Sequence, residues 1–161
     1  MVKKKGGKKF NFWLLVICLV VVYAVAFLGS LFTAPNTSTD WYNSIRPSIT
    51  PPNWVFPVVW NILFLLIGIS LYLSLHHSGN STLRKFVVFS FGINLFLNLV
   101  WSILYFGLHS PLAAFFDLIL LWVSILLMIR VSWKINKAAA YLLIPYLLWV
   151  TFAGVLNFLS I

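Results

Sequence analysis

Acidic residues are almost absent from this chain. Its 161 residues include only two, Asp40 and Asp117, against eleven lysines and arginines. Acid–base catalysis often depends on paired carboxylates, and no such pair is expected here. The chain also lacks a Ser/His/Asp set and the glycine patterns of nucleotide-binding loops. These absences favour a binding protein over an enzyme.

Cysteine and histidine are scarce too. The one cysteine, Cys18, rules out an intrachain disulfide. The three histidines, His76, His77 and His109, all fall in predicted loops or turns. Because no predicted span contains a histidine, axial ligation of a haem iron inside the membrane is not expected. We therefore expect no metal site and no cofactor that the fold requires.

Apolar residues, in contrast, dominate: 62% of the chain is hydrophobic and 8% is charged. A helix needs about 20 mostly apolar residues to cross a bilayer, so the length allows five spans and no separate soluble domain. The sequence predicts an all-α integral membrane protein, a bundle of five transmembrane helices. The expected spans are 12–32, 52–75, 86–106, 112–133 and 138–161, after a basic tail at 1–11. The first apolar run is too long for a signal peptide and is taken as a retained helix.

The basic residues gather on one side of the predicted membrane. The tail holds five, the second loop two and the segment 130–137 three, whereas the first loop holds only Arg46. Because basic loops stay in the cytoplasm, the N-terminus is predicted to be cytoplasmic and the C-terminus to lie outside. This arrangement accounts for the net charge of +9, so no nucleic-acid partner is expected.

Three predicted spans each carry one aromatic and polar face. Residues at helical spacing form these faces: Asn53, Pro57, Trp60 and Phe64; Asn94, Asn98, Trp101 and Tyr105; and Tyr146, Trp149, Ala153 and Asn157. With the predicted topology they meet in the outer half of the bundle. They indicate either a cavity for a large, flat, mostly apolar ligand or ordinary aromatic packing. Their amides either join helices or contact the ligand.

The longest loop, residues 34–50, leads into the second span. Pro51 and Pro52 are expected to open that helix, with Thr50 as its N-cap. Trp41 and Tyr42 in the loop either anchor it at the membrane interface or form part of a lid over the pocket.

Asp117 is a carboxylate inside the fourth predicted span, where a charge is costly. It serves either a functional site or a structural anchor. Arg46 is the only basic residue in the first loop, so an ion pair between Arg46 and Asp117 is expected if the loop folds over the bundle. Otherwise Asn98 or Trp101 is the expected hydrogen-bond partner of Asp117.

Several short motifs follow one another along the chain. They are Trp41-Tyr42, Arg46-Pro47-Ser48, Pro51-Pro52, Trp54-Val55-Phe56, Trp60, Leu97-Asn98, Trp101-Ser102, Phe106-Gly107, Asp117, Leu121-Trp122, residues 142–150 and Phe152-Ala153. Together they resemble the TspO/MBR family, which comprises the tryptophan-rich sensory proteins and the mitochondrial translocator proteins. The resemblance covers nearly the whole chain after the first span.

The resemblance implies a five-helix membrane protein, commonly a homodimer, in the cell membrane if the source is a prokaryote. It implies a receptor or sensor for porphyrins, such as protoporphyrin IX or haem, and for other lipophilic molecules. Light-dependent porphyrin degradation and transport of tetrapyrroles or lipids are the alternatives. Two departures from the family pattern stand out: Asn94 replaces a common glutamine, and the C-terminus lacks the proposed cholesterol motif. The second departure weakens the case for sterol binding and leaves it open.

The expected site combines residues from the family motifs with residues from the helix faces and the loop. The family motifs place Trp54, Trp60, Asn98, Trp101, Asp117, Trp149 and Ala153 in or behind the ligand cavity. The faces and the loop add Trp41, Pro52 and Phe64. Arg46, Asn94 and Asn157 are expected to support the lid or the surrounding structure.

Overall fold

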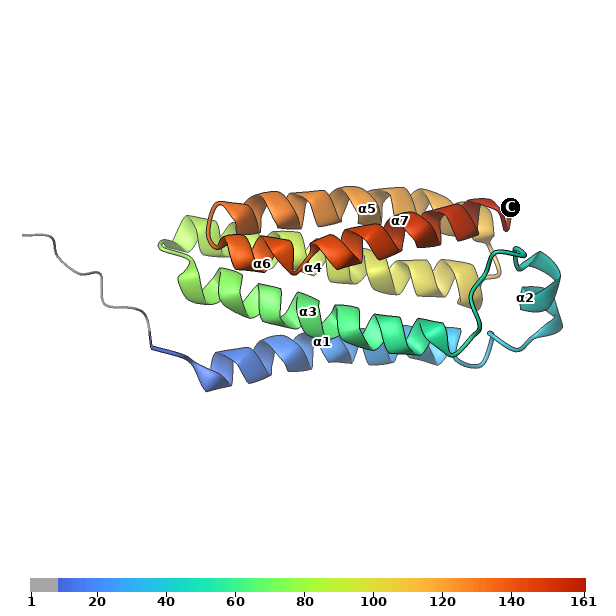
Figure 1. Ribbon diagram of the computed structural model, residues 1–161, viewed down its shortest axis with the longest axis horizontal. Coiled ribbons are helices and arrows are strands. Elements are labelled where there is room, and N and C mark those ends of the chain that lie inside the picture. Colours follow the sequence, from blue (N-terminus) through green and yellow to red (C-terminus); the bar gives the residue numbers. More distant parts are fainter. Residues whose placement is uncertain (1–8) are drawn as a thin grey trace, which may run out of the picture.

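The computed structural model describes residues 9–161, and over that range the protein is a bundle of long helices (Figure 1). Five helical segments are long and apolar enough to cross a membrane. They are α1 (Phe12–Thr33), α3 (Val55–His77), α4 (Ser81–Ser102) with its extension η1 (Ile103–Gly107), α5 (Pro111–Trp133), and α6 (Lys137–Tyr141) followed by α7 (Ile144–Phe158). The predicted all-α, five-span membrane architecture is confirmed. Of the predicted basic tail, residues 1–8 lie outside the described range.

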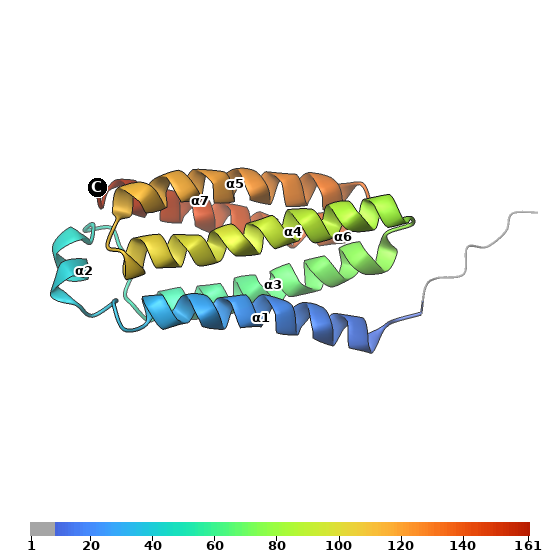
Figure 2. The same ribbon diagram turned by 180° about the vertical axis from the view of Figure 1, so that it is seen from behind.

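The bundle has two distinct ends, visible from both sides in Figures 1 and 2. One end carries Lys9 and the α3–α4 and α5–α6 connections, and is called the tail end below. The other carries the short helix α2 (Asp40–Ile45), the turn between η1 and α5, and the C-terminus, and is called the loop end. The corresponding halves of the bundle are called the tail half and the loop half.

Side-chain caps set the starts of α1 and α4. Asn11 accepts a hydrogen bond from the Leu14 amide at the start of α1, and Asn80 accepts one from the Leu83 amide at the start of α4. The Asn80 cap starts α4 at Ser81, five residues before the expected position. The prediction had placed the polar first turn in the preceding loop.

The second span begins later than expected. The sequence suggested Pro52 as its first residue and Thr50 as its cap, but α3 begins at Val55. Pro51 and Pro52 disfavour helical geometry in the residue before each of them, so the chain stays extended through Thr50 and Pro51. The Thr50 hydroxyl forms no hydrogen bond within residues 9–161 and therefore does not cap the helix.

Prolines shape the last two spans. Pro111 occupies the first turn of α5, where its missing N–H costs nothing. Pro145 cannot donate to the carbonyl of Tyr141, and the fifth span is interrupted between α6 and α7. Helix α7 ends at Phe158, three residues before the end of the expected span.

The main hydrophobic core runs along the bundle and reaches the cavity wall at Phe64. In its middle and tail-half part, Ile67, Phe91, Ile125 and Met128 are completely or almost completely buried. Two serine contacts join helices in the same half. The Ser70 hydroxyl donates to the carbonyl of Ala139 (2.8 Å), and that of Ser74 donates to Ser132 (3.0 Å).

Small residues also allow close helix contact in that half. At Gly68, even a Cβ atom would lie 2.6 Å from a methyl carbon of Leu19, so α1 and α3 touch here.

Candidate functional site

A cavity of about 530 Å³ lies in the loop half, within the ~300–1,000 Å³ usual for ligand pockets. Its walls come from α1, α3, α4, η1 and α7, and residues of the loop between α1 and α3 close its top. Helix α5 contributes no lining residue. The cavity therefore sits inside the membrane-spanning part of the bundle, directly beneath the loop.

Paired aromatic rings form part of the cavity wall. On α3, Trp60 and Phe64 stack with centroids 5.3 Å apart. Across the cavity, Trp101 stacks on Tyr105 at 5.1 Å. Each ring is held by a neighbouring ring, so a flat ligand would meet pre-positioned aromatic faces.

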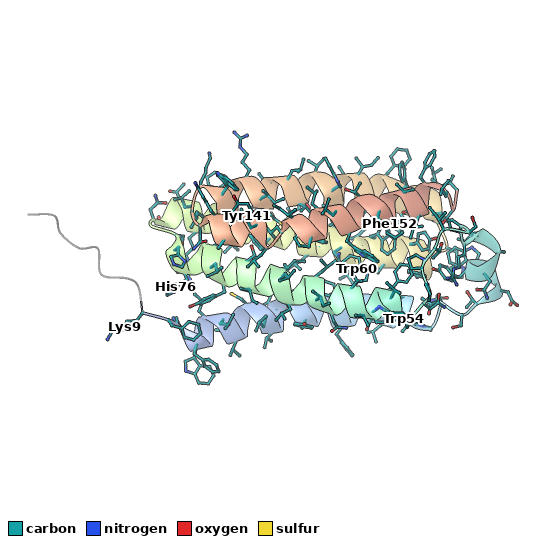
Figure 3. All side chains as sticks on the ribbon, in the orientation of Figure 1. Lys9, Trp54, Trp60, His76, Tyr141 and Phe152 are labelled. Atoms are coloured by element: carbon teal, nitrogen blue, oxygen red, sulfur yellow. The ribbon has the colours of Figure 1, made fainter. Side chains whose placement is uncertain are left out.

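One wall continues from α3 to α7. Phe56 of α3 meets Trp149 of α7 edge to face, with centroids 5.9 Å apart. Trp60 contacts Tyr146 of α7 in the same manner at 6.2 Å. Figure 3 shows Trp60 in the space between these two helices.

The buried amides form a chain of hydrogen bonds behind the cavity. Asn98 donates to the Tyr146 hydroxyl (3.3 Å), which donates to the Asn94 amide oxygen (3.3 Å). Asn94 then donates to Ser124 of α5 (2.8 Å). Asn94 is fully buried and does not line the cavity, so it joins helices; Asn98 both joins helices and lines the cavity.

A second set of hydrogen bonds fixes the wall formed by α4 and η1. The Trp101 indole donates to Asn157 (3.0 Å), which donates to the carbonyl of Pro111 (2.8 Å). The Tyr105 hydroxyl donates to Ser160 near the C-terminus (3.0 Å). These bonds connect η1, α5 and α7. The Trp101, Tyr105 and Asn157 side chains of this wall are therefore already hydrogen-bonded within the protein.

Two polar groups at the cavity have no such partner. The Trp149 indole nitrogen and the Thr50 hydroxyl oxygen are buried, and neither forms a hydrogen bond within residues 9–161. Both residues line the cavity. A buried donor without an acceptor costs about 1–3 kcal/mol. A ligand with hydrogen-bonding groups at its edge would offset that cost, and such a ligand fits this site.

The loop above the cavity contains α2, a short helix that the sequence had not indicated. Thr39 caps it by accepting a hydrogen bond from the Tyr42 amide (3.3 Å). Trp41 stacks on His109 at 4.1 Å, and Tyr42 packs against Phe106 at 5.7 Å. The loop is thus held against η1 and the following turn, where His109 adopts a positive φ of 50°. Burial raises the pKa of the Tyr42 hydroxyl.

The expected ion pair between Arg46 and Asp117 does not form. The Arg46 guanidinium donates instead to the carbonyls of Pro51 (2.8 Å) and Thr50 (3.4 Å), which precede α3. These extended carbonyls have no helical partner, so they satisfy the guanidinium within the loop itself. One Asp117 carboxylate oxygen is buried without a partner in the described range. Asn98 and Trp101, the alternative partners, are bonded elsewhere.

The structure brings seven of the thirteen residues singled out from the sequence to the cavity wall. They are Trp60, Phe64, Asn98, Trp101, Trp149, Ala153 and Asn157. The other six lie outside the lining: Trp41, Arg46, Pro52, Trp54, Asn94 and Asp117. Trp54 is 68% exposed at the start of α3 (Figure 3).

Sequence reasoning missed the wall contributed by the first span. The lining residues of α1 share one face of the helix: Tyr23, Ala26, Phe27, Gly29, Ser30 and Thr33. Small and hydroxyl-bearing residues recur at helical spacing in this otherwise aliphatic run, but that pattern alone does not distinguish a cavity wall from a face toward lipid. Asn61 was missed as well, although it is an amide within a span.

Comparison with known proteins gives a consistent result. Residues 17–160 match the TspO/MBR family. The chain is 42% identical to the tryptophan-rich protein TspO of Chlorobaculum tepidum, over 89% of this chain and 91% of that one. It is 42% identical to the protein of the same name from Archaeoglobus fulgidus, over 92% and 95% of the two chains. It is also 32% identical to the translocator protein of Bos taurus, over 82% and 79%.

Proposed function

The chain belongs to the TspO/MBR family, and from that premise we propose that it is a membrane receptor or sensor for porphyrins. Protoporphyrin IX and haem are the first candidates, with other flat lipophilic molecules as further ligands. The family is an integral membrane family, and the five spans place the cavity at membrane depth. The ligand would then reside within the bundle rather than in water.

The observation that carries this proposal is an aromatic cavity with few, fixed polar groups. Trp60 and Trp101 present ring faces that neighbouring rings hold in place. A planar macrocycle gains most from such faces, because stacked rings combine apolar burial with favourable geometry. The free indole N–H of Trp149 supplies one donor for a polar edge of the ligand.

Titration of the purified protein with protoporphyrin IX tests the proposal. The absorbance of the porphyrin should change saturably at micromolar concentration as it leaves water for the cavity. Trp60→Ala and Trp149→Ala should weaken binding, because each removes a wall of the cavity. Trp13→Ala is the matched control, since Trp13 is 73% exposed near the tail end and does not line the cavity. A wild-type protein without a saturable change would refute the proposal.

A second candidate function is light-dependent degradation of the bound porphyrin. The observation that favours it is the presence of three indoles, Trp60, Trp101 and Trp149, in the cavity wall. An excited porphyrin could react with these side chains or with species formed beside them. The discriminating result is a new product absorbance that requires both light and folded protein. Stable porphyrin under illumination, with binding intact, would leave the receptor as the supported function.

A further inference from the structure

The wall of the cavity is incomplete on one side. Most lining residues are buried or half-buried, including every one from α4, η1 and α7. The exposed lining residues all belong to two neighbouring segments of the chain. They are Phe27, Ser30 and Ala34 from α1 and its end, and Asn53, Pro57 and Asn61 from α3 and the residues before it. The cavity is therefore open along the line between α1 and α3.

The opening arises because α1 changes its partner along its length. In the tail half α1 lies against α3, where Leu19 closes on Gly68. In the loop half α1 lies against α4 instead: a Cβ atom on Gly29 would be 3.2 Å from the hydroxyl oxygen of Ser102. A Cβ atom on Gly107 of η1 would be 3.0 Å from the ring of Phe32 in α1. Helix α1 thus leaves α3 on the way to the loop end.

One hydrogen bond marks the point where the two helices separate. The Tyr23 hydroxyl of α1 donates to the backbone carbonyl of Asn61 in α3 (3.0 Å). That carbonyl would normally accept from residue 65, so the tyrosine adds a second bond at the rim. Beyond this contact, toward the loop end, the exposed residues of the opening begin.

The rim is polar at a depth where polar side chains are unusual. Asn61 is the seventh residue of α3, about 9 Å along the helix at 1.5 Å per residue. Its amide nitrogen donates to the carbonyl of Pro57 (2.8 Å), and its amide oxygen accepts no hydrogen bond within residues 9–161. Ser30 on the facing helix donates to Phe27 (2.7 Å). An amide oxygen facing hydrocarbon alone would be costly, so this rim suits contact with the polar edge of an amphipathic molecule.

The loop above the cavity, by contrast, is held by contacts on two sides. Its Trp41–His109 and Tyr42–Phe106 contacts attach it to η1 and the turn before α5. Asn53 attaches it near α3 by donating to the carbonyl of Thr37 (3.1 Å). It covers the top of the cavity as a roof with contacts on two sides.

We propose that the ligand reaches the cavity sideways, from the bilayer leaflet at the loop end, through the opening between α1 and α3. The ligand class is an amphipathic planar molecule already dissolved in the membrane. This inference rests on the proposed binding function and adds the route and the rim that admits the ligand. The roof stays in place while the ligand passes.

Binding kinetics in lipid nanodiscs test the route. Ser30→Phe adds a ring at the opening and should slow association and dissociation of protoporphyrin IX together, each by about tenfold. Because Ser30 also lines the cavity, the diagnostic result is the fall in both rate constants rather than the dissociation constant. Ala24→Phe is the matched control: Ala24 is exposed on the same helix but does not line the cavity, so its rates should equal those of the wild type.

A second variant, in the loop that covers the cavity, tests the alternative route. Trp41→Ala removes the stack on His109 and loosens the loop. If the ligand enters sideways, this change leaves the association rate within about twofold of the wild type. A faster rate in Trp41→Ala, together with unchanged rates in Ser30→Phe, would assign the route to the loop and overturn the inference. If that result came with saturable binding, the proposed function would stand and only the route would be wrong. If the wild-type protein did not bind porphyrin at all, both the function and the route would be refuted.

Discussion

The same long helices pack closely in the tail half of the bundle and enclose a cavity in the loop half. In the tail half, Gly68 and the serines let helices touch, and large aliphatic side chains fill what remains. In the loop half, rings such as Trp60 and Trp101 are braced by other rings and keep the helices apart. Small residues close a helix pair, because backbones can approach; mutually supported rings hold a space open. The cavity is a consequence of where each residue type lies along the helices.

The largest loss of stability is expected from adding a side chain to the closely packed tail half. Gly68→Leu places a side chain where a Cβ alone would lie 2.6 Å from Leu19, and should destabilise the protein by about 1–3 kcal/mol. Thermal unfolding in detergent measures the loss. Gly92→Leu is the control, since a Cβ there meets no atom within 4 Å. Equal stability of the two variants would show that the tail half is not closely packed.

A smaller effect, confined to ligand binding, is expected in the loop half. Trp149→Phe keeps a ring in the wall and removes the unpartnered N–H, so porphyrin affinity should fall by about 0.5–1.5 kcal/mol. Stability without ligand should not fall, because no internal hydrogen bond is lost. Trp101→Phe is the matched comparison: it breaks the bond to Asn157 and should lower the melting temperature of the free protein. The reverse pattern would mean that Trp149 is structural and that Trp101 is the group free for a ligand.

The smallest effect is expected at the border between the halves. Tyr146→Phe removes the hydroxyl that links Asn98 to Asn94, and helix-joining bonds in membranes are worth about 0.6 kcal/mol on average. Unfolding in detergent should show a loss of that order. The affinity for porphyrin should change little, since the hydroxyl serves the amides behind the wall. A large loss of affinity instead would place Tyr146 within the ligand site.

The sequence predicted the five spans and part of the aromatic wall because both depend on local patterns. Apolar length defines a span, and helical spacing puts Trp60 and Phe64 on one face. The wall from α1 was not predicted, because Tyr23 and Ser30 carry the same local signal whether they face lipid or a cavity. Only the change of helix partner decides that, and it depends on Gly29 and Gly68 at contacts far apart in the sequence.

The electrostatics of the loop were equally beyond local reasoning. The sequence predicted that Arg46 pairs with Asp117 because Arg46 is the only basic residue in the first loop. Backbone carbonyls compete for a guanidinium, however, and the double proline leaves those of Thr50 and Pro51 free. Counting charges alone therefore gave the wrong partner. The α2 helix likewise depends on its contact with His109, 68 positions after Trp41 in the chain.

The segment η1 has a consequence for the comparison of sequences within the family. In η1 the backbone hydrogen bonds span one residue more than in an α-helix. The Leu108 amide, for example, donates to the carbonyl of Ile103 (2.8 Å). Such a wide turn absorbs one inserted residue without changing the register of the helix before it. A relative whose corresponding helix is α-helical throughout should therefore align with a single-residue gap between positions 103 and 107. Relatives without that gap would then be the ones expected, from sequence alone, to present the residues at positions 105 and 106 to the cavity as this protein does.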